Sequence, residues 1–107
     1  MRNEYGVKLD KNGYAPSIMH IFADDACFNC EAIGDLCRHE IFNGSERERS
    51  KAYGLWVNLC PRCHMDIHND AELRRQLKVT GEMCALNWYD WTIEDFRERF
   101  GKNYVEE

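Results

Sequence analysis

The chain has 107 residues, of which 44% are hydrophobic and 31% charged, with six cysteines and a formal net charge of −5. This length suits one domain with a modest core, and the apolar runs fall short of the roughly 20 residues of a membrane-spanning helix. The acidic balance disfavours a general nucleic-acid-binding surface, since phosphate contacts usually leave a basic footprint.

The distribution of charge weakens that exclusion. Residues 38–78 carry eight basic and six acidic side chains, whereas residues 1–37 and 79–107 are acidic overall. The basic stretch also holds the metal motifs described below. We therefore expect any DNA contact to centre on residues 38–78, the alternative being a solvated face of mixed charge.

Turn-forming residues dominate the N-terminal segment. Asn12-Gly13 and Ala15-Pro16 predict turns and extended chain, and residues 17–23 predict a strand or one helical turn. His20 in this run is interpreted as a core or surface histidine. Cys27-Phe28-Asn29-Cys30 then predicts a zinc knuckle, a tight turn that directs two thiolates at one ion.

A β-hairpin followed by a helix is predicted next. Residues 33–42 can form the first arm, residues 45–53 a charged loop or short helix, and residues 54–59 a second strand that delivers Cys60 and Cys63. Pro61 suits the first position of a helix. His64 and His68 are four residues apart, so they share one face of that helix.

These residues offer two kinds of metal chemistry. Cys27, Cys30, Cys60 and Cys63 suffice for a closed, tetrahedral zinc site, and two imidazoles one helical turn apart suit a second, harder ion. A chain without a visible export signal favours metal ligands and free thiols over disulfides. Cys37 and Cys84 are therefore expected to be buried free thiols, with a ligand in a rearranged site as the alternative for Cys37. The expected compartment is the cytoplasm.

Two further helices are predicted after residue 69. Asn69 or Asp70 can cap the first, which Gly81 is expected to interrupt, and Thr92-x-x-Asp95 resembles a capping box for the second, with Gly101 as its C-cap. Four aromatic residues are interpreted as core packing, with a base-stacking surface as the alternative: Trp88, Trp91, Phe96 and Phe100.

The order of these motifs resembles that of the zinc-stapled HNH, or ββα-metal, endonucleases, most closely a group of small phage and prophage HNH proteins. The likeness covers most of the chain and is carried by Leu9-Asp10-x-Asn12-Gly13-Tyr14-Ala15-Pro16-Ser17, Cys27-x-x-Cys30, Arg38-His39-Glu40-Ile41-Phe42, Gly54-Leu55-Trp56-Val57, Leu59-Cys60-Pro61-x-Cys63-His64, His68 and the C-terminal residues Trp91, Phe96, Phe100-Gly101 and Asn103-Tyr104.

The resemblance implies an α+β fold of one domain, with a treble-clef-like core over residues 24–70 and a helical extension over 71–107. It implies a DNA endonuclease or nickase with one structural Zn²⁺ and a catalytic Mg²⁺ or Mn²⁺. DNA is the implied substrate, phage packaging or replication proteins are possible partners, and the implied setting is the cytoplasm of a bacterial host.

Roles for single residues also follow from the resemblance. His39 is the candidate general base, His64 and His68 are candidate ligands of the catalytic ion, and Arg47 and Arg49 could each hold a phosphate or be solvated charges. The family often has His-His or Asp-His where this chain has His39-Glu40. Either His39 is the base with Glu40 near the ion, or His39 is itself a ligand.

Two other readings fit parts of the pattern. By spacing, the middle asparagine of the family falls near Gly54, whereas Asn58 lies four residues later. Because this asparagine is not at its expected place, the main alternative is a non-catalytic treble-clef zinc module that binds nucleic acid or protein. A two-zinc cross-brace would use the four knuckle cysteines together with Cys37, His39, His64 and His68.

Overall fold

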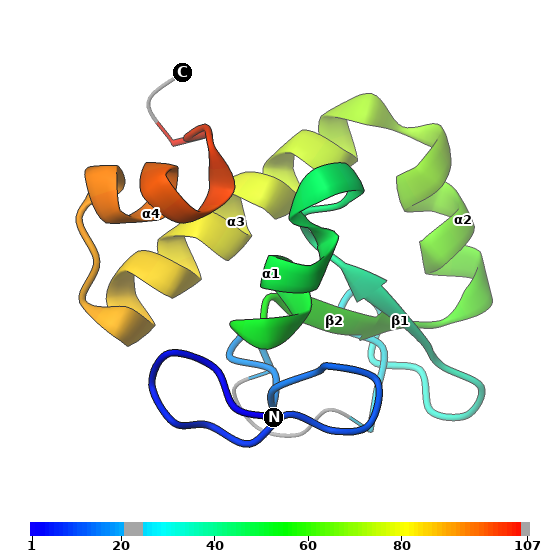
Figure 1. Cartoon of the computed structure of the whole chain (residues 1–107). Coiled ribbons are helices and arrows are strands. Elements are labelled where there is room, and N and C mark those ends of the chain that lie inside the picture. The colour runs from blue at the N-terminus through cyan, green and yellow to red at the C-terminus, as the bar shows by residue number, and fades with distance from the viewer. Residues whose placement is uncertain (21–24, 106–107) are drawn as a thin grey trace.

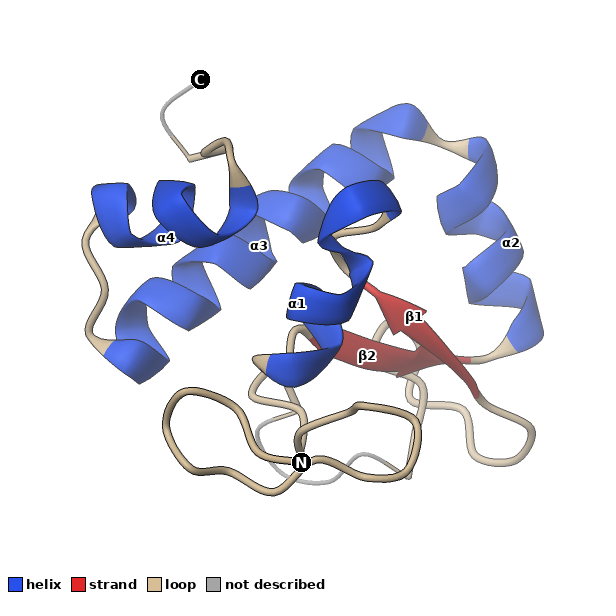
Figure 2. Cartoon of the chain, viewed as in Figure 1, coloured by secondary structure: helices blue, strands red, loops and turns tan. Residues whose placement is uncertain are grey.

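The computed structural model describes residues 1–20 and 25–105. These residues form an α+β structure, as expected, with four helices and one two-stranded sheet (Figures 1 and 2). The elements are β1 (Cys37–Glu40), a 3-10 turn η1 (Gly44–Glu46), α1 (Arg47–Ala52), β2 (Trp56–Leu59), α2 (Pro61–Asn69), α3 (Ala71–Tyr89) and α4 (Ile93–Phe100). No helix among the described residues is long and apolar enough to cross a membrane.

The sheet joins the two predicted hairpin arms. β1 and β2 are antiparallel, with His39 opposite Val57 and Glu40 opposite Trp56. Because side chains alternate along a strand, His39 and Glu40 lie on opposite faces of β1. α2 follows β2 directly and packs against both strands, so the two strands and α2 form one unit (Figure 1).

The helix ends follow the predicted capping residues. Pro61 is the first residue of α2, and the Asp70 side chain accepts from the backbone N–H groups at the start of α3. Thr92 and Asp95 form both halves of a capping box at α4. Gly101 ends α4 in the left-handed region with φ of 74°.

The predicted break at Gly81 is wrong, since α3 continues through it. A Cβ at this position would lie 2.9 Å from the Ile41 side chain, so glycine allows α3 to approach the segment after β1. The core lies between α3, α4 and the sheet and includes Ile41, Phe42, Leu55, Val57, Leu59, Ile67, Ala85, Trp91, Phe96 and Phe100. Trp88 is 65% exposed, so its predicted place in the core is wrong.

The N-terminal segment is irregular and passes below the sheet and α1 (Figure 2). Trp56 Nε1 donates to the Ala15 carbonyl at 2.7 Å, and the Ile18 N–H donates to the Gly54 carbonyl at 3.0 Å. A Cβ on Gly54, whose φ is 74°, would lie 2.3 Å from the Pro16 carbonyl oxygen. Residues 17–20 form neither a strand nor a helical turn, and residues 21–23 of that prediction lie outside the described residues.

Candidate metal centre and histidine cluster

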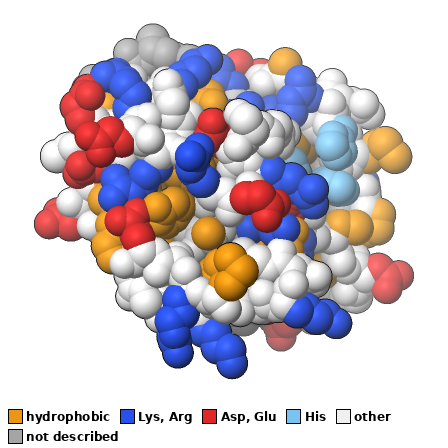
Figure 3. Space-filling view, viewed as in Figure 1, with side chains coloured by type: hydrophobic (Ala, Val, Ile, Leu, Met, Phe, Trp, Pro, Cys, Tyr) orange, Lys and Arg blue, Asp and Glu red, His pale blue; other side chains and the backbone are white. Residues whose placement is uncertain are grey.

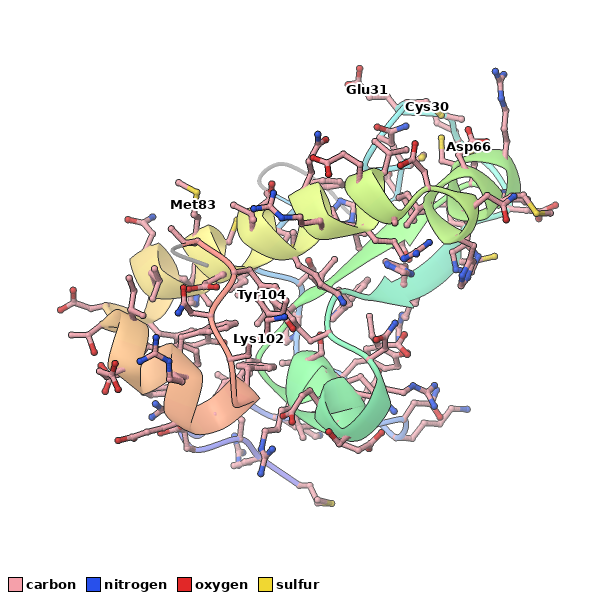
Figure 4. All side chains as sticks on the ribbon, turned by 90° about the horizontal axis from the view of Figure 1, so that it is seen from above. Cys30, Glu31, Asp66, Met83, Lys102 and Tyr104 are labelled. Atoms are coloured by element: carbon pink, nitrogen blue, oxygen red, sulfur yellow. The ribbon has the colours of Figure 1, made fainter. Side chains whose placement is uncertain are left out.

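The four cysteines of the two predicted knuckles meet at one end of the molecule. Their sulfur atoms all lie within 4.8 Å of one another, and Cys30 Sγ is 3.7 Å from Cys60 Sγ. Ligands of a tetrahedral zinc at about 2.3 Å are about 3.8 Å apart, so the sulfurs have the spacing of one closed site. Figure 4 shows Cys30 beside the part of α2 that carries Asp66. The four cysteines can hold a metal ion such as zinc.

Hydrogen-bond donors surround these sulfurs. Burial would raise the pKa of Cys27, but backbone N–H groups of Cys60, Cys30 and Asn29 outweigh it and lower that pKa to about 6. Asn29 lowers the pKa of Cys63, whereas burial and the neighbouring sulfurs raise it, with the net result of about 12. Without a metal ion, the four adjacent thiols therefore do not all ionise. A bound cation would offset the repulsion between four thiolates.

Asn29 is a supporting residue that the cysteine spacing did not identify. Its Nδ2 donates to Cys63 Sγ at 3.3 Å. Removing an outer-shell donor typically costs about 10–100-fold in metal affinity. We expect Asn29→Ala to lower zinc affinity by about tenfold, measured by competition with a chromogenic chelator. Asn87→Ala, an exposed change on α3, is the control, and equal zinc retention by both variants would contradict the role of Asn29.

The three histidines of the predicted catalytic set also come together. His39 projects from β1 toward α2, where its ring centroid lies 5.5 Å from that of His64 and 6.1 Å from that of His68. The Nε2 atoms of His64 and His68 are 3.2 Å apart. Two nitrogen ligands on one tetrahedral or octahedral ion are about 3.0–3.4 Å apart, so this pair has suitable spacing for a shared ion.

The position of His39 affects its protonation. Its side chain is only 8% exposed, and burial, followed by repulsion from His64 and His68, lowers its pKa to about 4. Burial and His68 also lower the pKa of His64. A neutral imidazole at pH 7 can accept a proton or bind a metal ion, so His39 suits either of the roles considered for it.

The histidines are less tightly gathered than the cysteines. Among the described residues, the four cysteines are the one group of three or more candidate ligands whose donor atoms lie close enough together to hold a single ion. Cys37 is exposed and lies outside this group, so its predicted burial is wrong. The second four-ligand site of a cross-brace therefore does not form among these residues. Cys84 is half-buried on α3, in contact with the core, as a free thiol.

Glu40 does not join the histidines. Its carboxylate accepts hydrogen bonds from Arg47 Nε at 2.6 Å and from the Tyr14 hydroxyl at 2.8 Å, on the face of β1 opposite His39. Burial raises the pKa of Glu40, but these two donors outweigh it and lower the pKa overall. Strand alternation therefore directs the Glu40 carboxylate away from the His39 side chain, and its place beside a catalytic ion stays a prediction.

The two candidate phosphate ligands are separated as well. Arg47 pairs with Glu40, whereas Arg49 pairs with Glu46 at 2.9 Å within the same helical region. They line different hollows of the surface, Arg47 beside Arg38 and Arg49 beside Tyr53. Both arginine side chains are more than half exposed and remain available for anions, but one phosphate group is not expected to contact both.

The residues around β2 have structural roles. Asn58 is a strand residue opposite Arg38, its backbone N–H donates to His20 Nε2 at 3.0 Å, and its carbonyl accepts from the Phe28 N–H at 2.8 Å. His20 therefore orients the edge of β2 and packs on Phe28, in keeping with its interpretation as a structural histidine.

Comparisons with protein-family models, curated proteins and solved structures found no match. The functional assignment therefore depends on the geometry of the cysteine site and the histidine cluster.

Proposed function

We propose that this protein is a metal-dependent DNA endonuclease or nickase of the HNH type, with a structural zinc at the four cysteines. The observation that carries the proposal is the meeting of His39 from β1 with His64 and His68 from α2. The cysteine site lies directly before these two helical histidines, since Cys60 and Cys63 begin α2. Zinc bound there would fix α2 against the sheet and hold the histidines in place.

The side chains divide the work of phosphodiester hydrolysis. His64 and His68 would hold Mg²⁺ or Mn²⁺, which supplies stabilisation of negative charge on the phosphate and on the leaving oxygen. His39, neutral at pH 7, accepts a proton from the attacking water at a ring nitrogen. Its burial limits rotation of the ring, which keeps the imidazole beside that of His64.

Glu40 and Arg47 have a supporting role in this proposal. The Glu40 carboxylate fixes both Arg47 and Tyr14, so it orients a phosphate-binding cation from the back of β1. Arg49 pairs with Glu46 instead, and the proposal gives it no catalytic role. The histidine atoms reach the surface beside several Lys and Arg side chains, as the right side of Figure 3 shows, so DNA can approach them directly.

Plasmid nicking tests the proposal. Protein purified without chelator is expected to convert supercoiled plasmid to open-circular or linear DNA when Mg²⁺ or Mn²⁺ is added, and to be inactive without it. Zinc content is measured on the same sample. Protein that keeps its zinc and fold but never cleaves, over a range of Mg²⁺ and Mn²⁺ concentrations, would favour the non-catalytic zinc module.

A further inference from the structure

A second charged surface lies behind the histidine cluster. An open hollow of about 1250 Å³ is lined by residues of the segment 8–16 and by side chains from β1, α1 and β2. Five cationic side chains line it, and we call it the basic groove: Lys8, Lys11, Arg38, Arg47 and Lys51. The groove is unexpected in a chain of net charge −5, and two of its cations come from the N-terminal segment, which is acidic overall.

Three of the five cations are held in place by carboxylates. Arg38 pairs with Asp10 at 3.0 Å, Arg47 with Glu40 and Lys51 with Glu48. Lys8 and Lys11 have no ion-pair partner within residues 1–20 and 25–105. The five cations and the three carboxylates therefore leave a net charge of +2, located on the two lysines.

The aromatic residues of the groove support its cations and are not available to stack on bases. The Arg38 guanidinium lies 4.3 Å from the centroid of the Tyr14 ring and 4.8 Å from that of Trp56. Lys51 Nζ lies 4.9 Å from the Tyr14 centroid. Trp56 is only 3% exposed. The groove thus offers prearranged positive charge without an open aromatic face.

We infer that the basic groove binds the sugar–phosphate backbone of a nucleic acid strand without regard to base sequence, an inference that rests on the proposed function for its choice of polyanion. The groove is open and charged, as a site for a continuous polyanion should be. Arg38 lines it and His39 is the next residue of β1, so the groove and the histidine cluster lie on opposite faces of β1. A nucleic acid strand bound in the groove would therefore hold the phosphates that flank the cleaved bond between residues 8–16 and β1.

The test measures binding apart from cleavage. His39→Ala protein, which should not cleave, is titrated into fluorescein-labelled 20-nucleotide single-stranded and duplex DNA of two unrelated sequences, without added divalent ions, at several salt concentrations. Adding Lys8→Gln and Lys11→Gln should weaken binding by about tenfold at low salt. The log–log salt slope should fall by about 1.4 to 1.8 for two lost phosphate contacts.

Arg97→Gln with Lys102→Gln is the matched control, because it removes the same charge from the region of α4 and the segment after it. Binding by this control within about twofold of the parent, with equal affinity for both sequences, supports the groove. Equal losses in both double variants would attribute binding to net charge and overturn it. So would no measurable DNA binding, or tighter binding of a poly-glutamate peptide than of DNA.

Failure of this inference can be told from failure of the proposed function. If the wild-type chain never nicks plasmid but Lys8 and Lys11 control DNA binding as expected, the groove stands and the nuclease proposal fails. If plasmid is nicked and DNA binding is unchanged by the Lys8 and Lys11 substitutions, the nuclease stands and the groove is wrong. Circular dichroism of each variant confirms that these exposed substitutions leave the fold intact.

Discussion

Replacing Cys60 with serine is expected to release zinc and to abolish cooperative unfolding. A structural zinc contributes roughly 10–16 kcal/mol of apparent binding energy, which is comparable to the roughly 5–15 kcal/mol total stability of a small domain. Cys60 also caps α2, since its Sγ accepts from the Cys63 N–H at 3.5 Å. One substitution therefore removes a metal ligand and loosens the helix that carries His64 and His68.

Elemental analysis and thermal unfolding by circular dichroism measure this effect on the same samples. Cys37→Ser and Cys84→Ser are matched controls, because both residues lie outside the four-sulfur group. We expect each control to keep one zinc per chain, with a modest loss of stability for Cys84→Ser because that thiol is half-buried. Full zinc content and an unchanged unfolding midpoint in Cys60→Ser would refute the assignment of the four ligands.

Local rules in the sequence were sufficient to predict the knuckles and the helix ends. Each Cys-x-x-Cys pair brings its own two sulfurs together, because the first pair occupies a tight turn and the second the start of α2, and the structure gathers all four. Pro61, Thr92 and Gly101 act through backbone groups within a few residues, so their effects do not depend on the rest of the fold. The shared face of His64 and His68 follows from helical spacing in the same way.

The errors concern contacts between distant segments. Gly81 does not end α3, because packing against Ile41 outweighs the low helix propensity of glycine. A place near the catalytic ion was one of two alternatives for Glu40, but the strand directs its carboxylate toward Tyr14 and Arg47, whose positions no local pattern reveals. The basic groove was missed for the same reason: Lys8 and Lys11 lie in a turn-rich segment that only the fold brings against β1 and α1.

His39→Ala is expected to abolish plasmid nicking while zinc and fold are kept. Loss of a general base typically lowers the rate by about 10²- to 10⁴-fold. His39 is buried, so His39→Gln is made alongside it to keep the volume filled and to separate a packing defect from a chemical one. Zinc content and the unfolding midpoint are measured for both variants, and both should resemble the wild type far more closely than Cys60→Ser does.

Manganese affinity, measured by titration calorimetry on the same variants, assigns the roles of the cluster. If His39 is the base, His39→Ala loses nicking but keeps manganese affinity, whereas His64→Ala and His68→Ala lose both, because their nitrogens are spaced for one ion. If His39 is a ligand, its loss lowers manganese affinity too. Glu40→Gln should leave manganese affinity unchanged, since its carboxylate contacts Arg47 and Tyr14. Full nicking by His39→Ala, with contaminating nuclease excluded, would end the mechanism proposed for this cluster and leave the zinc-binding module as the better account of the chain.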